Sequence, residues 1–407
     1  MLRFISNKKQ YCVFDIGTDK VVCLIFRIEN NKPIIIGMDH QKSFGFSKNN
    51  GIDVTNLAKT ISKAFKKSLP KDLNQRHITF FSSITDINLK TKKNYSDLNS
   101  GKLGVTKKDV RKIYKKSILE SKIKGKYLIH SHPLHFRIDD NKIIDDPIGK
   151  KCEKFGISSF NIMVDSKLYE KLNKCFKSEN IEIKNFFDSG LASATANLTL
   201  KEKREGVACI DIGSTTTKIV VFLNDKIIYS NVIPLGGENV SNDISKGLDI
   251  PKESAEHAKI INGTLSLPFN EKIEINSKGM KNKIINKNIL YGIIKPRYEE
   301  ILEIIRDFIF DDIYARVSIK SIVITGGASR IFGLTNLSQN IFNRKVRIGS
   351  ILNKESFFYN KPEFSTVLGL IKLAQENKKF QYSNELIKGS FFSAFDKLEN
   401  WIEESYA

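Results

Sequence analysis

The sequence predicts an α/β fold built from two related domains. Two segments, 11–26 and 209–222, share one pattern: an apolar strand ending in Asp-Ile-Gly, a short turn with hydroxyl side chains, and a second strand rich in β-branched residues. The two copies lie about two hundred residues apart, which indicates an internal duplication. A further apolar strand at 321–325 ends in a glycine pair, the third member of an ordered set of motifs.

The composition is that of a globular protein with sizeable cores. The chain has 407 residues, of which 41% are hydrophobic and 10% aromatic. Its formal net charge of +21 comes from lysines spread along the whole length, without an arginine stripe or a basic patch interleaved with aromatic residues. The pattern therefore argues against nucleic-acid binding, although a general attraction to acidic surfaces is expected.

Neither the cysteines nor the hydropathy indicates a metal motif or a membrane span. The five cysteines contain no Cys-x-x-Cys pair, which favours core residues in a reduced compartment. No run reaches the roughly 18 apolar residues of a transmembrane helix. Residues 1–9 are too short and polar for a signal peptide, so a cytosolic location is expected.

The first domain continues with a third strand at 33–38, a helix and a fourth strand at 78–82. Leu57, Ile61 and Phe65 recur at the spacing of one helix face. The expected element order is therefore β-β-β-α-β.

The composition changes between 84 and 163, which predicts an inserted segment. Residues 90–99 are rich in Lys and Asn and are interpreted as a loop, and Thr106 is typical of a helix N-cap. Strands are expected at 127–130, 134–138 and 159–164. His130, His132 and His135 could hold a metal or mark an exposed strand edge around Pro133, and the absence of a matching Asp, Glu or Cys set favours the edge.

A second set of elements follows the inserted segment. A helix at 166–178 and a strand at 181–183 precede small residues at 188–197 that allow close helix packing, and a third strand of the second hairpin is expected at 226–230. Gly236 and Gly237 stand just before a helix, where they could form an anion-binding turn or a plain loop. Residues 248–288 are interpreted as a small insertion with a helix at 252–261 and strands at 264–267 and 272–275. A long helix is predicted from about 293, with Pro296 in its first turn.

The Asp-Ile-Gly turns have the chemistry of a phosphate site. A turn of this kind offers backbone N–H groups and hydroxyls to phosphate, and Asp211 can hold Mg²⁺, usually through water. One such turn could be a structural hairpin. The second copy at Asp15 makes a two-sided arrangement, and Gly326-Gly327 would let a base or ribose lie directly on the backbone.

With these motifs the chain resembles the FtsA family of actin-like cell-division proteins over essentially its whole length. Asp15-Ile-Gly17-Thr18 and the segment from Asp211 to Thr216 match its two phosphate motifs, and Thr325-Gly-Gly-Ala328 matches its adenosine motif. The insertion in the first domain and Pro296-Arg-Tyr-Glu-Glu300 point to FtsA within the superfamily. The resemblance implies an α/β, actin-like fold of duplicated ribonuclease H-like domains, with a relocated inserted subdomain and a C-terminal amphipathic helix.

The resemblance also implies the ligands, ATP and Mg²⁺, and the residues that bind them. Asp15 and Asp211 would act as the catalytic and Mg²⁺-organising acids. Glu300 and Lys259 would lie near the ribose and base, and Arg297 and Glu303 would contact FtsZ. The remaining nucleotide contacts would come from Gly17, Thr18, Gly213, Ser214, Thr215, Thr216, Gly236, Gly237, Gly326, Gly327 and Ala328.

The segment that positions the attacking water in hydrolysing relatives is not matched. Asp188 is the only acid near that stretch of this chain. This departure favours a nucleotide-dependent assembly switch with slow hydrolysis at most.

The C-terminal stretch predicts a linker and an amphipathic helix. Residues 375–388 are polar, and Ser390 is a good N-cap for a helix at 389–407. The resemblance makes this helix a membrane-targeting element, and docking on the protein's own body is the alternative. Acidic residues outnumber basic ones in it, so apolar insertion must dominate over attraction to anionic lipid. Its apolar side would comprise Phe391, Phe392, Phe395, Leu398, Trp401 and Ile402.

The expected domains are 1–83 with 164–200, the inserted subdomain 84–163, and a second domain 201–374 with a small insertion at about 245–306. By resemblance, the partners are the FtsZ C-terminal tail, other division proteins through the inserted subdomain, membrane lipid and further copies in a filament. The expected place is the cytoplasmic face of the plasma membrane at the division septum. Two alternatives remain: the actin-like protein of pilus assembly and, from another class, a small-molecule kinase of the sugar-kinase branch.

Overall fold

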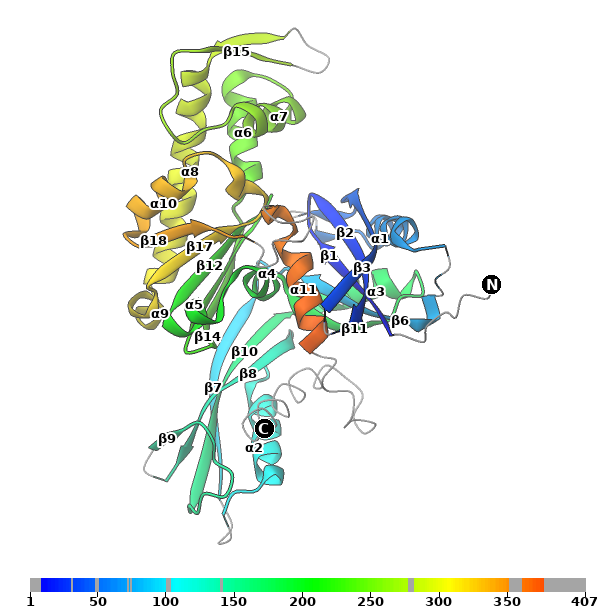
Figure 1. Cartoon of the computed structure of the whole chain (residues 1–407), viewed down its shortest axis with the longest axis vertical. Coiled ribbons are helices and arrows are strands. Elements are labelled where there is room, and N and C mark those ends of the chain that lie inside the picture. The colour runs from blue at the N-terminus through cyan, green and yellow to red at the C-terminus, as the bar shows by residue number, and fades with distance from the viewer. Residues whose placement is uncertain are drawn as a thin grey trace. The chain divides into compact units, whose positions relative to one another are not determined.

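The computed structural model describes residues 9–30, 32–47, 51–71, 73, 75–99, 104–139, 142–276, 282–350 and 361–376. Two compact units divide the chain (Figure 1). The first comprises Met1–Thr195 with Thr366–Ala407, and the second is the continuous stretch Ala196–Ser365. The last described helix, α11 (Ser365–Glu376), therefore lies almost wholly in the first unit, whereas the sequence interpretation had placed residues up to 374 in the second domain.

The first unit contains a five-stranded sheet in the order β11-β6-β1-β2-β3. β1 pairs antiparallel with β2 and parallel with β6. Phe14 of β1 packs its ring against Phe65, Phe80 and Phe176, which anchors the helices α1 and α3 on the sheet. The strands are β1 (Gln10–Ile16), β2 (Lys20–Glu29), β3 (Lys32–Lys42), β6 (Ile78–Ile84) and β11 (Ile183–Asp188); the helices are α1 (Val54–Ser68), α3 (Ser166–Lys177) and α4 (Ser189–Asn197).

The second unit repeats this topology with the order β14-β13-β12-β17-β18. β12 again pairs antiparallel with the next strand, β13, and parallel with a strand much later in the chain, β17. The two sheets thus have equivalent strand directions and connections, which confirms the predicted α/β duplication. The strands are β12 (Val207–Ile212), β13 (Thr217–Leu223), β14 (Lys226–Ile233), β17 (Ser321–Thr325) and β18 (Lys345–Ile348).

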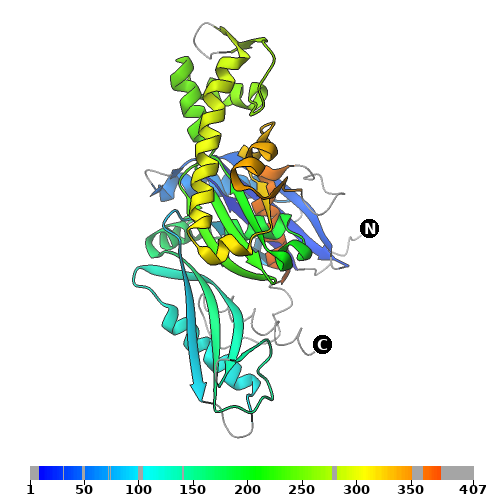
Figure 2. The same ribbon diagram turned by 90° about the vertical axis from the view of Figure 1, so that its left-hand side faces the viewer.

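Helices and a small hairpin complete the second unit (Figure 2). The long helix α8 carries one buried face, which includes Leu290, Ile294 and Ile301, into the core of this unit. The hairpin of β15 (Lys272–Ile275) and β16 (Lys283–Asn286) lies at the end of the unit near α7. The helices are α5 (Leu200–Glu205), α6 (Gly237–Leu248), α7 (Lys252–Asn262), α8 (Lys287–Phe310), α9 (Ile313–Ser318) and α10 (Leu334–Phe342).

The inserted segment forms a four-stranded sheet, β7-β10-β8-β9, covered by α2 (Lys107–Ser121). Thr106 caps α2 with a capping box, as predicted. The expected loop at 90–99 is wrong, because these residues form β7 (Lys90–Asn99), which pairs along its length with β10 (Lys154–Asp165). β7 is the edge strand on its side of the sheet, and lysines are typical of edges because they block further pairing.

Three further expectations about elements are corrected. One strand, β8 (Lys126–Ile138), replaces the two predicted on either side of Pro133, with a register shift opposite Ser158 and Ser159. Residues 264–267 form only an isolated bridge between Thr264 and Phe332. α8 begins at Lys287, so Pro296 lies inside the helix and not in its first turn. The predicted linker beyond 376 and the terminal helix at 389–407 lie outside the described residues.

Candidate nucleotide-binding site

The turn between β12 and β13 is built from backbone hydrogen bonds and holds the start of α6. Gly213 N donates to the carbonyl oxygen of Thr216 at 2.9 Å. The carbonyl oxygens of Gly213 and Ser214 accept from the N–H groups of Gly237 (2.9 Å) and Glu238 (2.8 Å). The turn and the helix N-terminus are therefore joined directly.

This bonding changes the role that the sequence suggested for Gly236 and Gly237. The first N–H groups of α6 are already used by the turn, and Gly236 N itself donates to Asn239 Oδ1 at 3.1 Å. A Cβ at Gly236 would lie 2.6 Å from the carbonyl oxygen of Gly213, so only glycine fits. The pair therefore provides close backbone approach, whereas the predicted anion-binding turn would need those N–H groups as donors.

Asp211 lies at the end of β12, buried to 4% exposure, directly opposite Thr325 of β17. Its Oδ2 is 3.7 Å from Nζ of Lys218, which is enclosed at 13% side-chain exposure. Gly326 follows Thr325 with φ +91°, and a Cβ there would collide with Asp211 Oδ1 and the carbonyl oxygen of Ile212. The carboxylate and the glycine pair, predicted from separate stretches of sequence, thus meet at one point.

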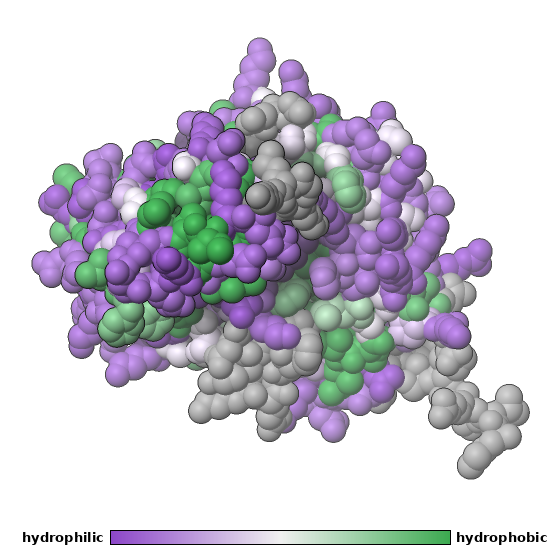
Figure 3. All heavy atoms as spheres, turned by 90° about the horizontal axis from the view of Figure 1, so that it is seen from above, coloured by the Kyte–Doolittle hydropathy of each residue, from purple (hydrophilic) through white to green (hydrophobic). Residues whose placement is uncertain are grey.

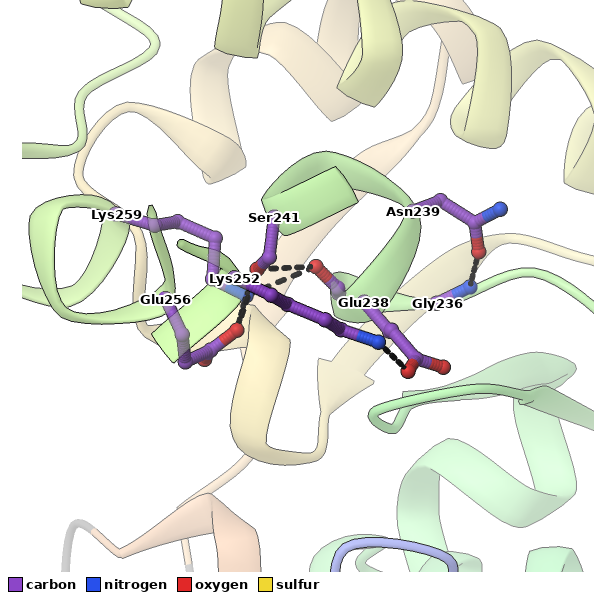
Figure 4. Close-up of polar contacts among 8 residues, drawn as sticks. Gly236, Glu238, Asn239, Ser241, Lys252, Glu256 and Lys259 are labelled. Atoms are coloured by element: carbon purple, nitrogen blue, oxygen red, sulfur yellow. Dashed lines mark hydrogen bonds and ion pairs between the residues drawn. The ribbon is translucent and has the colours of Figure 1, made fainter. Parts of the chain in front are cut away.

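Lys259 of α7 reaches the same region (Figure 4). Its Nζ donates to the carbonyl oxygen of Gly237 (2.8 Å), to Ser241 Oγ (2.8 Å) and to Glu256 Oε2 (2.7 Å). A Cβ on Gly237 would meet the methyl group of Ala328 at 3.0 Å and Lys259 Nζ at 3.3 Å. Lys259, Gly237 and Ala328 therefore lie close together, and Ser241 and Glu256 are polar neighbours of Lys259 that the sequence did not indicate.

Residues of the Pro-Arg-Tyr-Glu-Glu segment of α8 have two roles: Tyr298 contacts this site, and Arg297 and Glu300 belong to an ion-pair network. Tyr298 is buried and its hydroxyl donates to the carbonyl oxygen of Ala328 at 2.8 Å, while burial raises its pKa. Arg297 contacts Asp243 and Glu300, and the hydrogen bond to Asp243 raises the pKa of the guanidinium further. Glu300 is thus held by Arg297, and Glu303 is exposed.

The first unit carries the equivalent turn. Gly17 N donates to the carbonyl oxygen of Lys20 at 3.0 Å, three residues on, as Gly213 does to Thr216. Ser83 of β6 donates its hydroxyl to Asp15 Oδ1 at 2.9 Å and accepts from Ile16 N at 3.0 Å. Asp15 is therefore fixed from the neighbouring parallel strand, by a residue that the sequence interpretation missed.

The carboxyl edge of the first sheet gathers further polar groups. Thr85 Oγ1 and Ser189 Oγ are 2.6 Å apart, one residue beyond the ends of β6 and β11. Ligands of open α/β sheets bind at this edge of parallel strands. Asp188 is buried and its Oδ2 accepts from Leu191 N at 2.7 Å, so this carboxylate caps α4.

The carboxylates of the two turns could hold Mg²⁺ only together with waters and the phosphates of a nucleotide. Among the described residues no group of three or more His, Cys, Asp or Glu could hold a metal ion. Mg²⁺ commonly binds one or two carboxylates, waters and substrate phosphates, so the single carboxylate that each unit offers, Asp15 or Asp211, suits Mg²⁺ bound together with nucleotide. The expectation that the histidines around Pro133 mark an exposed strand edge is wrong for His130, which is only 1% exposed.

The structure has an actin-like fold in which the same strand–turn–strand unit occurs twice. The structure of the PilM-PilN type IV pilus biogenesis complex has a TM-score of 0.63 at 13% identity, covering 88% of this chain and 97% of that one. MreB5 of Spiroplasma citri bound to ADP has a TM-score of 0.56 at 13% identity, covering 92% and 99%. These likenesses establish the fold alone.

Sequence comparison finds that the chain is similar to the FtsA family of cell division proteins, over part of its length by the family model and over nearly all of it by individual relatives. The family model described as "Cell division protein FtsA" matches residues 208–369. The cell division protein FtsA of Agrobacterium fabrum is 27% identical over 439 residues, covering 100% of this chain and 97% of that protein. That of Buchnera aphidicola is 29% identical over 430 residues (98% and 99%), and that of Bacillus subtilis 28% over 391 residues (92% and 86%).

Proposed function

We propose that this protein is an ATP-dependent assembly switch that ties FtsZ filaments to the membrane during cell division. The observation that carries the proposal is the convergence of Asp211, Gly213, Gly237 and Gly326 in a chain similar to FtsA proteins. At each of the three glycines a Cβ would meet a backbone oxygen or a side chain within 3.0 Å. The three glycines thus let the turn, the start of α6 and the end of β17 pack closely around Asp211.

The nucleotide contacts are assigned within each unit. We infer that Ser214 and Thr215 in the second unit and Thr18 in the first donate to phosphate. Gly213 and Gly17 use their N–H groups to close the turns and would contact phosphate only through close backbone approach, and Thr216 contributes its carbonyl oxygen to the turn. Gly327 and Ala328 would support the adenosine, with Lys259 beside them and Glu300 farther along α8. Asp15 and Asp211 would hold Mg²⁺ through water. Bound Mg²⁺ would neutralise phosphate charge, and these residues bind and orient the nucleotide.

Slow hydrolysis is expected from Asp188. A carboxylate that positions an attacking water must face that water. Asp188 is 1% exposed and accepts the N–H of Leu191. Its use as a helix cap supports ATP as a switch more than as a fast-turnover substrate.

We place the FtsZ tail on the small insertion of the second unit. Large hydrophobic side chains are exposed there, including Leu267 at 78% and Phe269 at 91%, and Figure 3 shows hydrophobic residues gathered on the face seen from above. Exposed apolar patches of this kind mark interaction sites. Arg297 and Glu303 of α8 would add charged contacts, although Arg297 must then share its ion pairs with Asp243 and Glu300.

The remaining partners follow the family. The terminal helix with Phe391, Phe395 and Trp401 would bind lipid at the cytoplasmic face of the septal membrane, and self-association into filaments would strengthen that binding by avidity. Within the described residues no helix is long and apolar enough to cross a membrane. Other division proteins would bind the inserted subdomain.

Nucleotide binding is tested by titrating MgATP into the wild type and Asp211→Asn. The substitution removes the negative charge that faces Mg²⁺, and we expect affinity to fall at least tenfold. Asp225→Asn, which breaks an exposed ion pair with Arg204, is the matched control and should bind like the wild type. Equal MgATP affinity in all three proteins would refute the assigned site.

The tether is tested by co-sedimenting the full chain with FtsZ and lipid vesicles, with and without ATP. We expect FtsZ to pellet with vesicles only when this protein is present, and more strongly with ATP. Capture of a pilus-assembly partner without FtsZ would favour the alternative suggested by the PilM-like fold. ATP-dependent phosphorylation of a sugar would favour the kinase alternative.

A further inference from the structure

His130 joins the inserted subdomain to the carboxyl edge of the first sheet. It belongs to β8, which pairs with β10 and β9 of the inserted sheet. Its Nε2 accepts the backbone N–H of Asp188, the last residue of β11, at 2.9 Å. The bond therefore links two different sheets of the first unit through one side chain.

The histidine is held firmly on the inserted-subdomain side. It is 1% exposed and its ring stacks on Phe187 (centroids 5.8 Å apart) and on His132 (5.6 Å). Because Nε2 accepts a hydrogen bond, the ring is neutral, with its proton on Nδ1. A displacement of β8 must therefore act on the Asp188 N–H or break a buried hydrogen bond.

The Asp188 N–H lies beside the groups that would contact nucleotide. The carboxylate of Asp188 caps α4 through Leu191 N, and the next residue, Ser189, shares a 2.6 Å hydrogen bond with Thr85. Thr85 lies just beyond β6, two residues after Ser83, which holds Asp15. One continuous set of hydrogen-bonded and chain-adjacent groups thus leads from β8 to the first phosphate turn.

Asp86 provides a second set of hydrogen bonds at the base of the inserted subdomain. Asp86 accepts the N–H groups of Asn88 (2.8 Å) and Asp165 (2.6 Å) and so fastens both chain connections of the inserted subdomain. The hydrogen bond of His130 lies apart from these connections, so it is a separate contact through which β8 and the end of β11 can affect each other.

We propose that His130 is a positioning residue that transmits nucleotide occupancy at the first sheet edge to the inserted subdomain. The inference rests on the nucleotide site of the proposed function. Nucleotide binding at the first sheet edge would change β8 through the His130–Asp188 hydrogen bond. Since coupling between sites is reciprocal, a partner on the inserted subdomain would alter nucleotide affinity by the same route.

The test is amide hydrogen exchange of the full chain, with and without MgATP, in four proteins. His130→Phe keeps a stacking ring but removes the acceptor, and His130→Gln restores an acceptor oxygen near the position of Nε2. Tyr114→Phe is the matched control, because it removes another buried hydrogen bond to this strand, from the Tyr114 hydroxyl to the Ser131 carbonyl oxygen (2.7 Å), which does not involve β11.

In the wild type, His130→Gln and Tyr114→Phe, we expect MgATP to slow exchange at least threefold both in β8 and around Gly213–Gly237. In His130→Phe the β8 response should be lost while the Gly213–Gly237 response stays. An equal β8 response in His130→Phe, or none in a wild type whose Gly213–Gly237 segment does respond, overturns the inference alone. Absence of any response in the wild type overturns the proposed nucleotide site and this inference with it.

Discussion

At the residue scale, the duplicated Asp-Ile-Gly motif determines two turns that the structure builds with the same hydrogen bond. Gly17 and Gly213 each donate to the carbonyl oxygen three residues on. Local sequence sufficed for these turns because all their atoms come from one short segment. The contacts of Ser83 with Asp15 and of Tyr298 with Ala328 could not be predicted, because the partners lie 68 and 30 residues apart in the sequence. Identifying them requires the register of parallel strands and the position of α8, which no local pattern encodes.

Gly326→Ala tests how tightly the second site is closed. Gly326 has φ +91°, and an added methyl would meet Asp211 and the Ile212 carbonyl, so we expect about 2–3 kcal/mol of lost stability together with weaker MgATP binding. Thermal unfolding and nucleotide titration provide the measurements. Gly292→Ala is the control, since nothing lies within 4 Å of its Cβ on the exposed side of α8, and it should be neutral or stabilising. Similar losses in both variants would contradict the steric argument.

At the element scale, amphipathic helices and capped helix starts can be predicted from the sequence. The edge strand β7 and the position of Pro296 inside α8 cannot. The α1 face with Leu57, Ile61 and Phe65 is buried as expected. The Lys- and Asn-rich composition of β7 predicts a loop because its pairing depends on β10, which lies more than fifty residues later in the sequence. Pro296 suggested a first turn, yet α8 continues through it, supported by the buried face of the helix.

Pro296→Ala should stabilise the second unit. Proline lacks the N–H that would donate to the Gly292 carbonyl, and its ring is exposed, so little packing is lost by its removal. We expect the free energy of unfolding to rise by about 1 kcal/mol or more, measured by denaturant titration. Glu303→Ala, an exposed change on the same helix, should stay within about 0.5 kcal/mol. A destabilised Pro296→Ala protein would show that the proline is needed for the shape of α8.

The ion pair between α5 and β18 should make stability depend on acid pH. Burial of Glu202 opposes its ionisation, but hydrogen bonds from Arg347 and Thr199 favour the carboxylate and hold its pKa below the ordinary 4.5. Because the folded-state pKa is lowered, the stabilisation is fully present above about pH 4.5 and is lost as pH falls through the lower folded-state value.

Glu202→Gln measures this contribution. We expect a loss of about 1 kcal/mol at neutral pH that disappears in acid, when wild type and variant are unfolded side by side. Glu205→Gln on the same helix removes only an exposed pair with Lys201 and should have no effect at either pH. A loss that persists unchanged in acid would assign the effect to packing instead of charge.

At the scale of the whole molecule, the repeated topology of the two sheets is the part of the fold that the sequence predicted best. The internal repeat was visible in strand and turn patterns, and the structure shows equivalent strand orders. The similarity to FtsA proteins agrees with the motifs that first indicated it. The location of α11 could not be foreseen, since its close fit against α4 depends on Gly369 lying against the Ala192 backbone.

Vesicle flotation tests the terminal segment of the molecule. We expect the full chain to float with lipid vesicles and a chain ending at Lys388 to stay in solution, because the aromatic side chains that would insert into the bilayer lie beyond 388. The net negative charge of that segment predicts little dependence on anionic lipid. Equal flotation of both proteins would refute the anchor.

The return of α11 to the first unit also affects how the chain folds during synthesis. The second unit is one continuous stretch, Ala196–Ser365, whereas the first needs residues from 366 onward. Until α11 emerges from the ribosome, the Ala192 backbone of α4 lacks its close contact with Gly369, and the Thr195 carbonyl lacks the Lys372 ammonium that donates to it at 3.1 Å. The unit that begins the chain is therefore the last to be completed, and ribosome-bound chains stalled before 366 should have a protease-resistant second unit beside a sensitive first one.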